Sequence, residues 1–183
     1  MLKAQYDYRT RRTKTVEKGT VKLYIYDGGV NVQEYDSAGS LTKQLVRGSG
    51  MGGGIGSILY TDSNSDSSRR FFIYNALGSV SSITDSCSRV VSFDSHDAWG
   101  QTVSASAAAG ERENRKFCTK ERTTSIGLDN FGFRYYDYEL GRFLTRDPAD
   151  YPDGPNNYLY CSNDPVNKID PLGLAEYWTS SQS

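Results

Sequence analysis

Hydrophobic and polar residues alternate along most of the first hundred positions, in short runs that end at polar or glycine-containing turns. Alternation with a period of two is typical of half-buried β-strands, and an Asp/Gly turn between two such runs is typical of a β-hairpin. The same unit of strand and turn recurs along the chain, as expected for a repeat architecture in which each unit covers its neighbour. The alternating runs are 21–27, 30–35, 41–46, 71–74, 80–84 and 90–93.

The C-terminal third holds the densest stretch of aromatic, arginine and glycine residues, between Gly127 and Leu174. Its alternating rings, Phe131 to Tyr135 and then Leu140 to Phe143, predict two short strands about a turn at 139–141. Three Asp-Pro pairs predict turns, because proline fixes its own φ and keeps the residue before it out of the helical region. These pairs are Asp147-Pro148, Asp164-Pro165 and Asp170-Pro171. The pattern therefore predicts an all-β, mostly antiparallel fold, an open and curved sheet of hairpins with an irregular C-terminal core segment.

Two stretches interrupt the strand pattern. Residues 48–53 spell G-x-G-x-x-G after a predicted strand, but further glycines follow where a dinucleotide site needs a helix. We therefore interpret 47–70 as a flexible connection between strands. Residues 104–120 combine alanines with charged side chains, which favours a solvated loop with at most a short exposed helix. The expected organisation is 1–103 for the repeated strands and turns, 104–126 for a linker or loop, 127–174 for the core and 175–183 for a short tail.

Composition argues against several classes of function. Lysine and arginine number 21 against 22 acidic residues, so the net charge of -1 provides no field that would attract nucleic acid. No apolar run approaches the roughly 18 residues of a membrane-spanning helix. The single histidine, His96, leaves too few ligands for most zinc sites and one candidate base for a Ser-His-Asp triad. The cysteines fit no close zinc spacing, and we expect Cys87, Cys118 and Cys161 to be small buried side chains. We expect no metal and no cofactor.

Four segments carry a resemblance to a known family. Tyr74–Val80 is similar to the family's His-Leu-Gly-Ser segment, Phe133–Asp137 to its Arg-Tyr-Tyr-Asp and Gly141–Phe143 to its Gly-Arg-Phe. Asp170–Leu174 resembles its closing Asp-Pro-Leu-Gly-Leu motif. With the repeated Tyr-Asp and glycine turns, these segments resemble rearrangement-hotspot (RHS) or YD-repeat proteins over most of the chain. The C-terminal third resembles their RHS repeat-associated core.

That resemblance implies a fold and an activity. In the family, many repeats wind into one spiral β-sheet that forms a hollow shell, and the core segment plugs one end. Some members cut themselves after the closing motif and free a C-terminal toxin or effector that stays enclosed. The cut is attributed to an aspartic-protease-like pair, which would here be Asp147 and Asp170 with Arg134 as a supporting cation. The scissile bond would be Leu174–Ala175.

The chemistry of such a cut fits those residue types. Two close carboxylates cannot both ionise, so one keeps a proton while the other takes a proton from water, without a metal or a cofactor. An arginine beside them lowers the cost of their charge and fixes their geometry. From the residues alone, an Asp before a Pro is more often a turn former, and Asp164 is given only that role. Arg134 is likewise more often a surface or cross-strand ion-pair residue.

Two functions from different classes stay open. The leading one is the C-terminal part of an RHS shell that encapsulates a toxin or effector, with aspartyl-type self-cleavage after Leu174. The alternative is a non-enzymatic YD-repeat module, degenerate or truncated, whose exposed tyrosines bind carbohydrate or a protein. Expected partners are the N-terminal repeats of the shell and a C-terminal effector, without nucleic acid and without a membrane span. The resemblance implies a secreted or cell-surface protein, and the tail from Ala175 on is too short to be a toxin domain.

Overall fold

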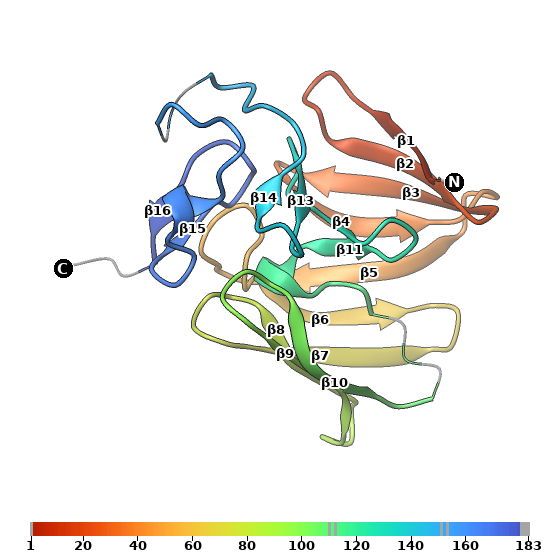
Figure 1. Cartoon of the computed structure of the whole chain (residues 1–183). Helices are drawn as coiled ribbons and strands as arrows, with labels where there is room; N and C mark the ends of the chain where they lie inside the picture. The colour runs from red at the N-terminus through yellow and green to blue at the C-terminus, as the bar shows by residue number, and fades with distance from the viewer. Residues whose placement is uncertain (1, 110, 112, 151, 153, 180–183) are drawn as a thin grey trace.

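One sheet of ten antiparallel strands dominates the computed structural model, which describes residues 2–109, 111, 113–150, 152 and 154–179. Its strands are β1 (Leu2–Tyr6), β2 (Arg12–Glu17), β3 (Thr20–Asp27), β4 (Val30–Tyr35), β5 (Leu41–Arg47), β6 (Ile58–Ser63), β7 (Ser68–Tyr74), β8 (Val80–Thr84), β9 (Val90–His96) and β10 (Thr102–Ala107). Every strand pairs with the next one along the chain, as Figure 1 shows, and β1 and β10 form the two edges of an open sheet.

The same type of side-chain hydrogen bond stabilises the turns of five hairpins. In the turn between β4 and β5, the main-chain N–H groups of Ala38 and Ser40 donate to Asp36 Oδ1, and Gly39 has a φ of +80°. An acidic or amide oxygen that accepts from the backbone two and four residues ahead stabilises a tight turn, and glycine takes the positive φ without steric cost. The residues that make these contacts are Asp7, Asp36, Asn75, Asp85 and Asp97. The same turn chemistry therefore recurs with the strand repeat.

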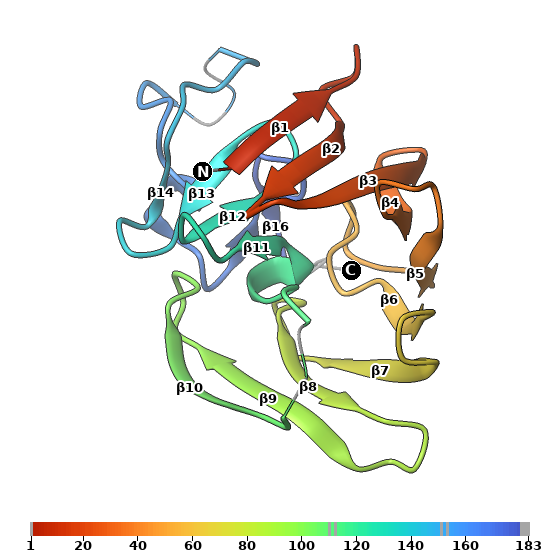
Figure 2. The ribbon, with the colours of Figure 1, turned by 90° about the vertical axis from the view of Figure 1, so that its right-hand side faces the viewer.

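The remaining elements are short. Most lie inside the curve of the large sheet (Figure 2), and the last two strands lie at one end of it (Figure 1). These short elements are η1 (Phe117–Thr119) and η2 (Cys161–Asn163), which are 3₁₀ turns, and β11 (Glu121–Thr123), β12 (Leu128–Asn130), β13 (Tyr135–Asp137), β14 (Arg142–Phe143), β15 (Lys168–Ile169) and β16 (Tyr177–Trp178). β11 to β14 form a four-stranded antiparallel sheet, and β15 pairs with β16. The expectation of an all-β, antiparallel, open and curved sheet with an irregular C-terminal core is confirmed.

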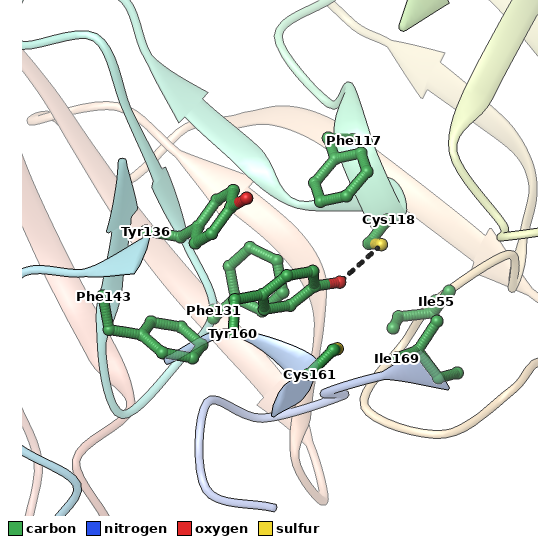
Figure 3. Packing of buried hydrophobic residues seen from close by; sticks show 9 residues of the cluster. All are labelled: Ile55, Phe117, Cys118, Phe131, Tyr136, Phe143, Tyr160, Cys161 and Ile169. Atoms are coloured by element: carbon green, nitrogen blue, oxygen red, sulfur yellow. Dashed lines mark hydrogen bonds between the residues drawn. The ribbon is translucent and has the colours of Figure 1, made fainter. Parts of the chain in front are cut away.

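An aromatic cluster forms the main core, between the curved sheet and the C-terminal segments (Figure 3). The ring centroids of Phe131, Tyr136, Phe143 and Tyr160 lie 4.7 to 5.8 Å apart. Most of these rings meet edge to face or tilted, which aromatic quadrupoles favour over face-to-face stacking. The buried Tyr136 hydroxyl donates to the main-chain carbonyl of Trp99 at 2.7 Å. This bond attaches the core segment to the turn that follows β9.

Buried ion pairs also attach the later segments to the sheet. Arg115 lies 2.6 Å from Glu34 of β4 and 3.1 Å from Glu113. Glu121 of β11 pairs with Arg12 of β2. A buried charge that loses its partner is strongly destabilising, so these pairs fix the position of the segment between β10 and β11.

Two stretches expected as loops are ordered parts of the fold, and both expectations are wrong. Within 47–70, β6 pairs with β5 and with β7, and Ile55 is fully buried in the aromatic core. Within 104–126, η1 and β11 follow the end of β10, and Phe117–Lys120 are all buried rather than solvated. Charged residues near Phe117 suggested solvent, but they form ion pairs with the sheet and do not keep the segment exposed.

Two smaller expectations also change. Cys118 and Cys161 are buried free thiols, whereas Cys87 is exposed in a turn. The aromatic run Phe131–Tyr135 does not form one strand, because the chain turns between β12 and β13, where the N–H of Phe131 donates to the carbonyl of Arg134 at 3.0 Å. This turn places Arg134 at the site described below.

Candidate functional site

Arg134 lies between the two carboxylates singled out by the sequence analysis. Its Nη2 is 2.8 Å from Asp147 Oδ2 and 3.1 Å from Asp170 Oδ2, so one guanidinium nitrogen contacts both acids. The exposed fractions of Arg134, Asp147 and Asp170 are 3%, 6% and 1%. The turn after β12 positions the arginine, the loop after β14 positions Asp147, and Asp170 directly follows β15. The structure therefore brings these three residues together in a buried site.

Main-chain amides surround Asp170. Its Oδ1 accepts the N–H groups of Leu172 at 3.2 Å, Gly173 at 2.7 Å and Leu174 at 3.0 Å. These bonds form the tight turn of the closing motif, in which Gly173 has a φ of +74°. Burial raises the pKa of Asp170, and the amide donors together with Arg134 oppose only part of that shift. Asp170 therefore holds a proton more readily than an ordinary aspartate.

Asp147 has a different set of partners. Its Oδ1 accepts the N–H of Ala149 at 2.8 Å, and its own N–H donates to the carbonyl of Asn157 at 3.2 Å. Arg134 Nη1 donates to the same Asn157 carbonyl at 3.1 Å, and the guanidinium lies 3.7 Å from the centroid of the Phe143 ring. The arginine is thus fixed in place by the core as well as by the two acids.

The closing motif is held from two sides. Arg134 Nε donates to the carbonyl of Gly173 at 2.7 Å. Lys120 Nζ donates to the carbonyls of Gly53 at 2.9 Å and Pro171 at 2.6 Å, and burial lowers the pKa of Lys120 to about 8. The glycine-rich loop approaches so closely that a Cβ added at Gly53 would lie 2.1 Å from the Pro171 carbonyl oxygen. The backbone that leads into the expected scissile bond is therefore fixed against the site.

A groove of about 310 Å³ lies beside the Leu174–Ala175 bond. Both residues of that bond line it, together with Met51 and Gly52 of the glycine-rich loop and with Pro171. Leu174 and Ala175 are only partly buried, in contrast to the acids. The expected scissile bond thus lies at the boundary between the buried site and solvent.

The other candidate residues lie apart from this arrangement. Asp164 accepts from Asn167 Nδ2 at 2.9 and 3.2 Å, as a turn residue. His96 packs with its ring centroid 6.5 Å from that of Phe117, and burial lowers its pKa to about 4, so it is neutral at pH 7. Over the described residues, no three His, Cys, Asp or Glu side chains gather in a possible metal site. None of the helical turns described is long or apolar enough to span a membrane.

Sequence reasoning missed two residues of the site. Lys120 belongs to a stretch expected to be solvated, and the run Phe117–Thr119 just before it is the signal that could have indicated burial. Asn157 carries no local signal, because it contributes through its main-chain carbonyl. Contacts of this kind depend on the path of the backbone and on no particular side-chain pattern.

The site has the charge balance that acid–base chemistry needs. With both carboxylates ionised, Arg134 and its two partners carry one net negative charge, so the uptake of one proton makes the group neutral. Burial favours that neutral state. A pair of carboxyl groups that shares one proton can accept a proton from water and donate one to a leaving group.

The chain is similar to known proteins over most of its length. No protein-family model matches the chain. The curated protein "tRNA3(Ser)-specific nuclease WapA" of Bacillus spizizenii is 32% identical over 177 residues, which are 92% of this chain and 7% of that protein. "Toxin subunit YenC1" of Yersinia entomophaga is 33% identical over 109 residues, or 58% of this chain and 11% of the relative.

Solved structures share the fold. The crystal structure of TcdB2-TccC3-Cdc42 matches with a TM-score of 0.73 at 24% identity, over 94% of this chain and 9% of that chain. The matching region therefore spans only about a tenth of each of these larger proteins.

Proposed function

Because this chain belongs to the RHS (YD-repeat) family of toxin-related proteins, we propose that it closes the C-terminal end of an RHS shell and cuts its own backbone there. The observation that carries the proposal is the single nitrogen of Arg134 that contacts both Asp147 and Asp170. The same arginine holds the carbonyl of Gly173 in the closing motif. The bond proposed for cutting, Leu174–Ala175, follows that motif directly.

The role of the cut follows from what the relatives are named. One is a nuclease and another is a toxin subunit, and the region similar to this chain is a small part of each. We infer that the larger part of such a protein supplies the remaining shell strands and a C-terminal effector of the toxin class. The cut would separate that effector from the shell that encloses it.

Hydrolysis of the peptide bond requires one acid and one base. Asp170 holds the proton of the pair, because burial raises its pKa, and Asp147 takes a proton from a water molecule. The water oxygen bonds to the carbonyl carbon of Leu174, the nitrogen of Ala175 receives the proton of Asp170, and the C–N bond breaks. Arg134 keeps the two carboxylates at a fixed separation during these transfers.

Intact-mass spectrometry after prolonged incubation tests the proposal. The purified chain should lose Ala175–Ser183, and Asp147→Asn or Asp170→Asn should each stop the loss, because one carboxyl group cannot be both acid and base. Asp164→Asn is the matched control and should still be cut, since Asp164 only forms a turn. A full-length mass from folded wild-type chain would reject self-cleavage and favour the non-enzymatic module.

A further inference from the structure

The side chain of Asn157 is a buried polar group that has no role in the site as described above. Asn157 is 8% exposed, and neither its Oδ1 nor its Nδ2 has a hydrogen-bond partner within the described part of the chain. Burial of an amide without partners carries the full desolvation penalty, and in native proteins it calls for an explanation such as an ordered water or a catalytic role. The local turn does not use this side chain, because Asn156 Oδ1 accepts the N–H of Tyr158 at 3.1 Å.

The main chain of Asn157 belongs to the site. Its carbonyl accepts the N–H of Asp147 at 3.2 Å and Nη1 of Arg134 at 3.1 Å. The carboxamide belongs to the residue whose carbonyl makes both of these contacts, and it is buried with that residue. A donor and an acceptor without protein partners are therefore buried in a residue whose main chain contacts both Arg134 and Asp147.

We propose that the Asn157 carboxamide holds the water molecule that attacks the scissile bond. This inference rests on the proposed function. A carboxamide offers both a donor and an acceptor, so it can orient the water through Nδ2 or Oδ1 while one hydrogen of the water is directed at Asp147. Holding a reactant in the attacking geometry removes much of the entropic part of the barrier.

The proton balance leaves Asn157 unchanged. The held water transfers one proton to Asp147 as its oxygen bonds to the carbonyl carbon of Leu174. The nitrogen of Ala175 then takes the proton of Asp170 as the C–N bond breaks. The products are a new carboxyl terminus and a new amino terminus, and Asn157 acts as a positioning residue because it exchanges no proton.

If Asn157 positions the attacking water, its replacement by leucine should slow self-cleavage without lowering stability. In Asn157→Leu, an apolar side chain of similar size replaces a buried carboxamide that has no protein partner, so the urea midpoint of unfolding should stay the same or rise. The rate of self-cleavage, followed by intact mass, should fall on the order of 100-fold, because the water is no longer held in place. Undiminished cutting by folded Asn157→Leu, or a loss of cutting accompanied by a lower midpoint, would overturn the proposal.

The adjacent asparagine supplies a matched control. Asn156→Leu removes the acceptor of the Tyr158 N–H, so its urea midpoint should fall. Its folded molecules should still cut at the wild-type rate, because the hydrogen bonds of Asn156 within the described residues go to Tyr158 and Leu159 and not to the site. A loss of cutting in this variant as large as in Asn157→Leu would mean that the turn matters rather than the Asn157 carboxamide, and would overturn the proposal.

A crystal structure of uncut Asp170→Asn separates this inference from the cut itself. We expect an ordered water within hydrogen-bond distance of both the Asn157 carboxamide and the Asp147 carboxylate. The absence of a water in contact with the carboxamide would overturn the inference, whether or not the wild type cuts. Such a water together with a full-length wild type would reject the proposed cut and leave the water site of Asn157 standing.

Discussion

At the scale of single residues, Arg134 contacts two buried carboxylates at once. Arg134→Ala leaves Asp147 and Asp170 buried without a cation, so we expect the free energy of unfolding to fall by about 3–5 kcal/mol and self-cleavage to stop. Arg134→Lys should retain part of the stability but not the cutting, because a single ammonium lacks the planar fork that also reaches Gly173. Urea unfolding followed by circular dichroism measures the first effect. An unchanged stability of Arg134→Ala would contradict the central role of this cation.

Asp170 should make stability depend on pH. Its pKa in the folded state lies above the ordinary value of 3.8, so the folded chain binds the proton more tightly than the unfolded chain does. The resulting stabilisation is fully present below pH 3.8 and is lost as pH rises through the raised pKa. Wild type should therefore lose stability relative to Asp170→Asn across that window, as measured by urea unfolding at a series of pH values. Parallel curves for the two proteins would contradict the raised pKa.

Lys120 should have the opposite effect in alkaline solution. Burial lowers its pKa from 10.5 to about 8, so between these values the unfolded chain binds a proton that the folded chain has released. Stability should therefore rise over this range in wild type relative to Lys120→Met, by at most about 3 kcal/mol. The measurement is the difference in unfolding free energy between the two proteins from pH 7 to pH 10.5. A difference that does not change with pH would mean that Lys120 titrates as it does in water.

At the scale of elements, the glycine-rich loop between β5 and β6 packs closely on the closing motif. A comparison of two glycine substitutions tests how much this packing contributes to stability. Gly53 and Gly28 have similar positive φ values, +52° and +55°, so alanine strains both backbones alike. Only at Gly53 does the added Cβ meet another segment, the Pro171 carbonyl. Gly53→Ala should lower the free energy of unfolding by about 1–3 kcal/mol more than Gly28→Ala does, as measured by urea unfolding. Equal losses would mean that the loop moves away without cost.

Local signals made the hairpins predictable. The turn at Asp36 depends on contacts that reach no further than Ser40, so a short window of sequence contains all of its chemistry. Arg134, Asp147 and Asp170 were named through the family resemblance, because nothing in their spacing specifies that they meet. The structure brings the three together, and their catalytic role stays a prediction.

Long-range pairing made the remaining buried elements unpredictable. Charged residues are seldom buried without partners, so a charged segment indicates solvent exposure when its partners are unknown. The partner of Arg115 is Glu34, on a strand far earlier in the chain. Lys120 likewise binds carbonyls of Gly53 and Pro171, which belong to distant loops. Burial of Arg115 and of Phe117–Lys120 therefore depends largely on partners that lie far away in the sequence.

At the scale of the whole molecule, the open sheet ends in an unprotected edge at β10. Strand β10 is exposed along its length and contains no proline and no charged residue, which are the usual protections against edge pairing. We expect the isolated chain to associate as its concentration rises, in sedimentation velocity measurements. The double change Ser104→Lys and Ser106→Lys should reduce that association through charge repulsion. A wild-type chain that stays monomeric at every concentration would contradict edge pairing.

The order of the ten strands has a consequence for timing. Each strand pairs with its sequence neighbour, so the sheet can form hairpin by hairpin with little loss of loop entropy. The site requires contacts between the last third of the chain and the much earlier Gly53, and contacts of such long sequence separation are slow to form. The rate of folding would then limit the rate of the proposed cut, because the carboxylates meet only after the large sheet around them has formed.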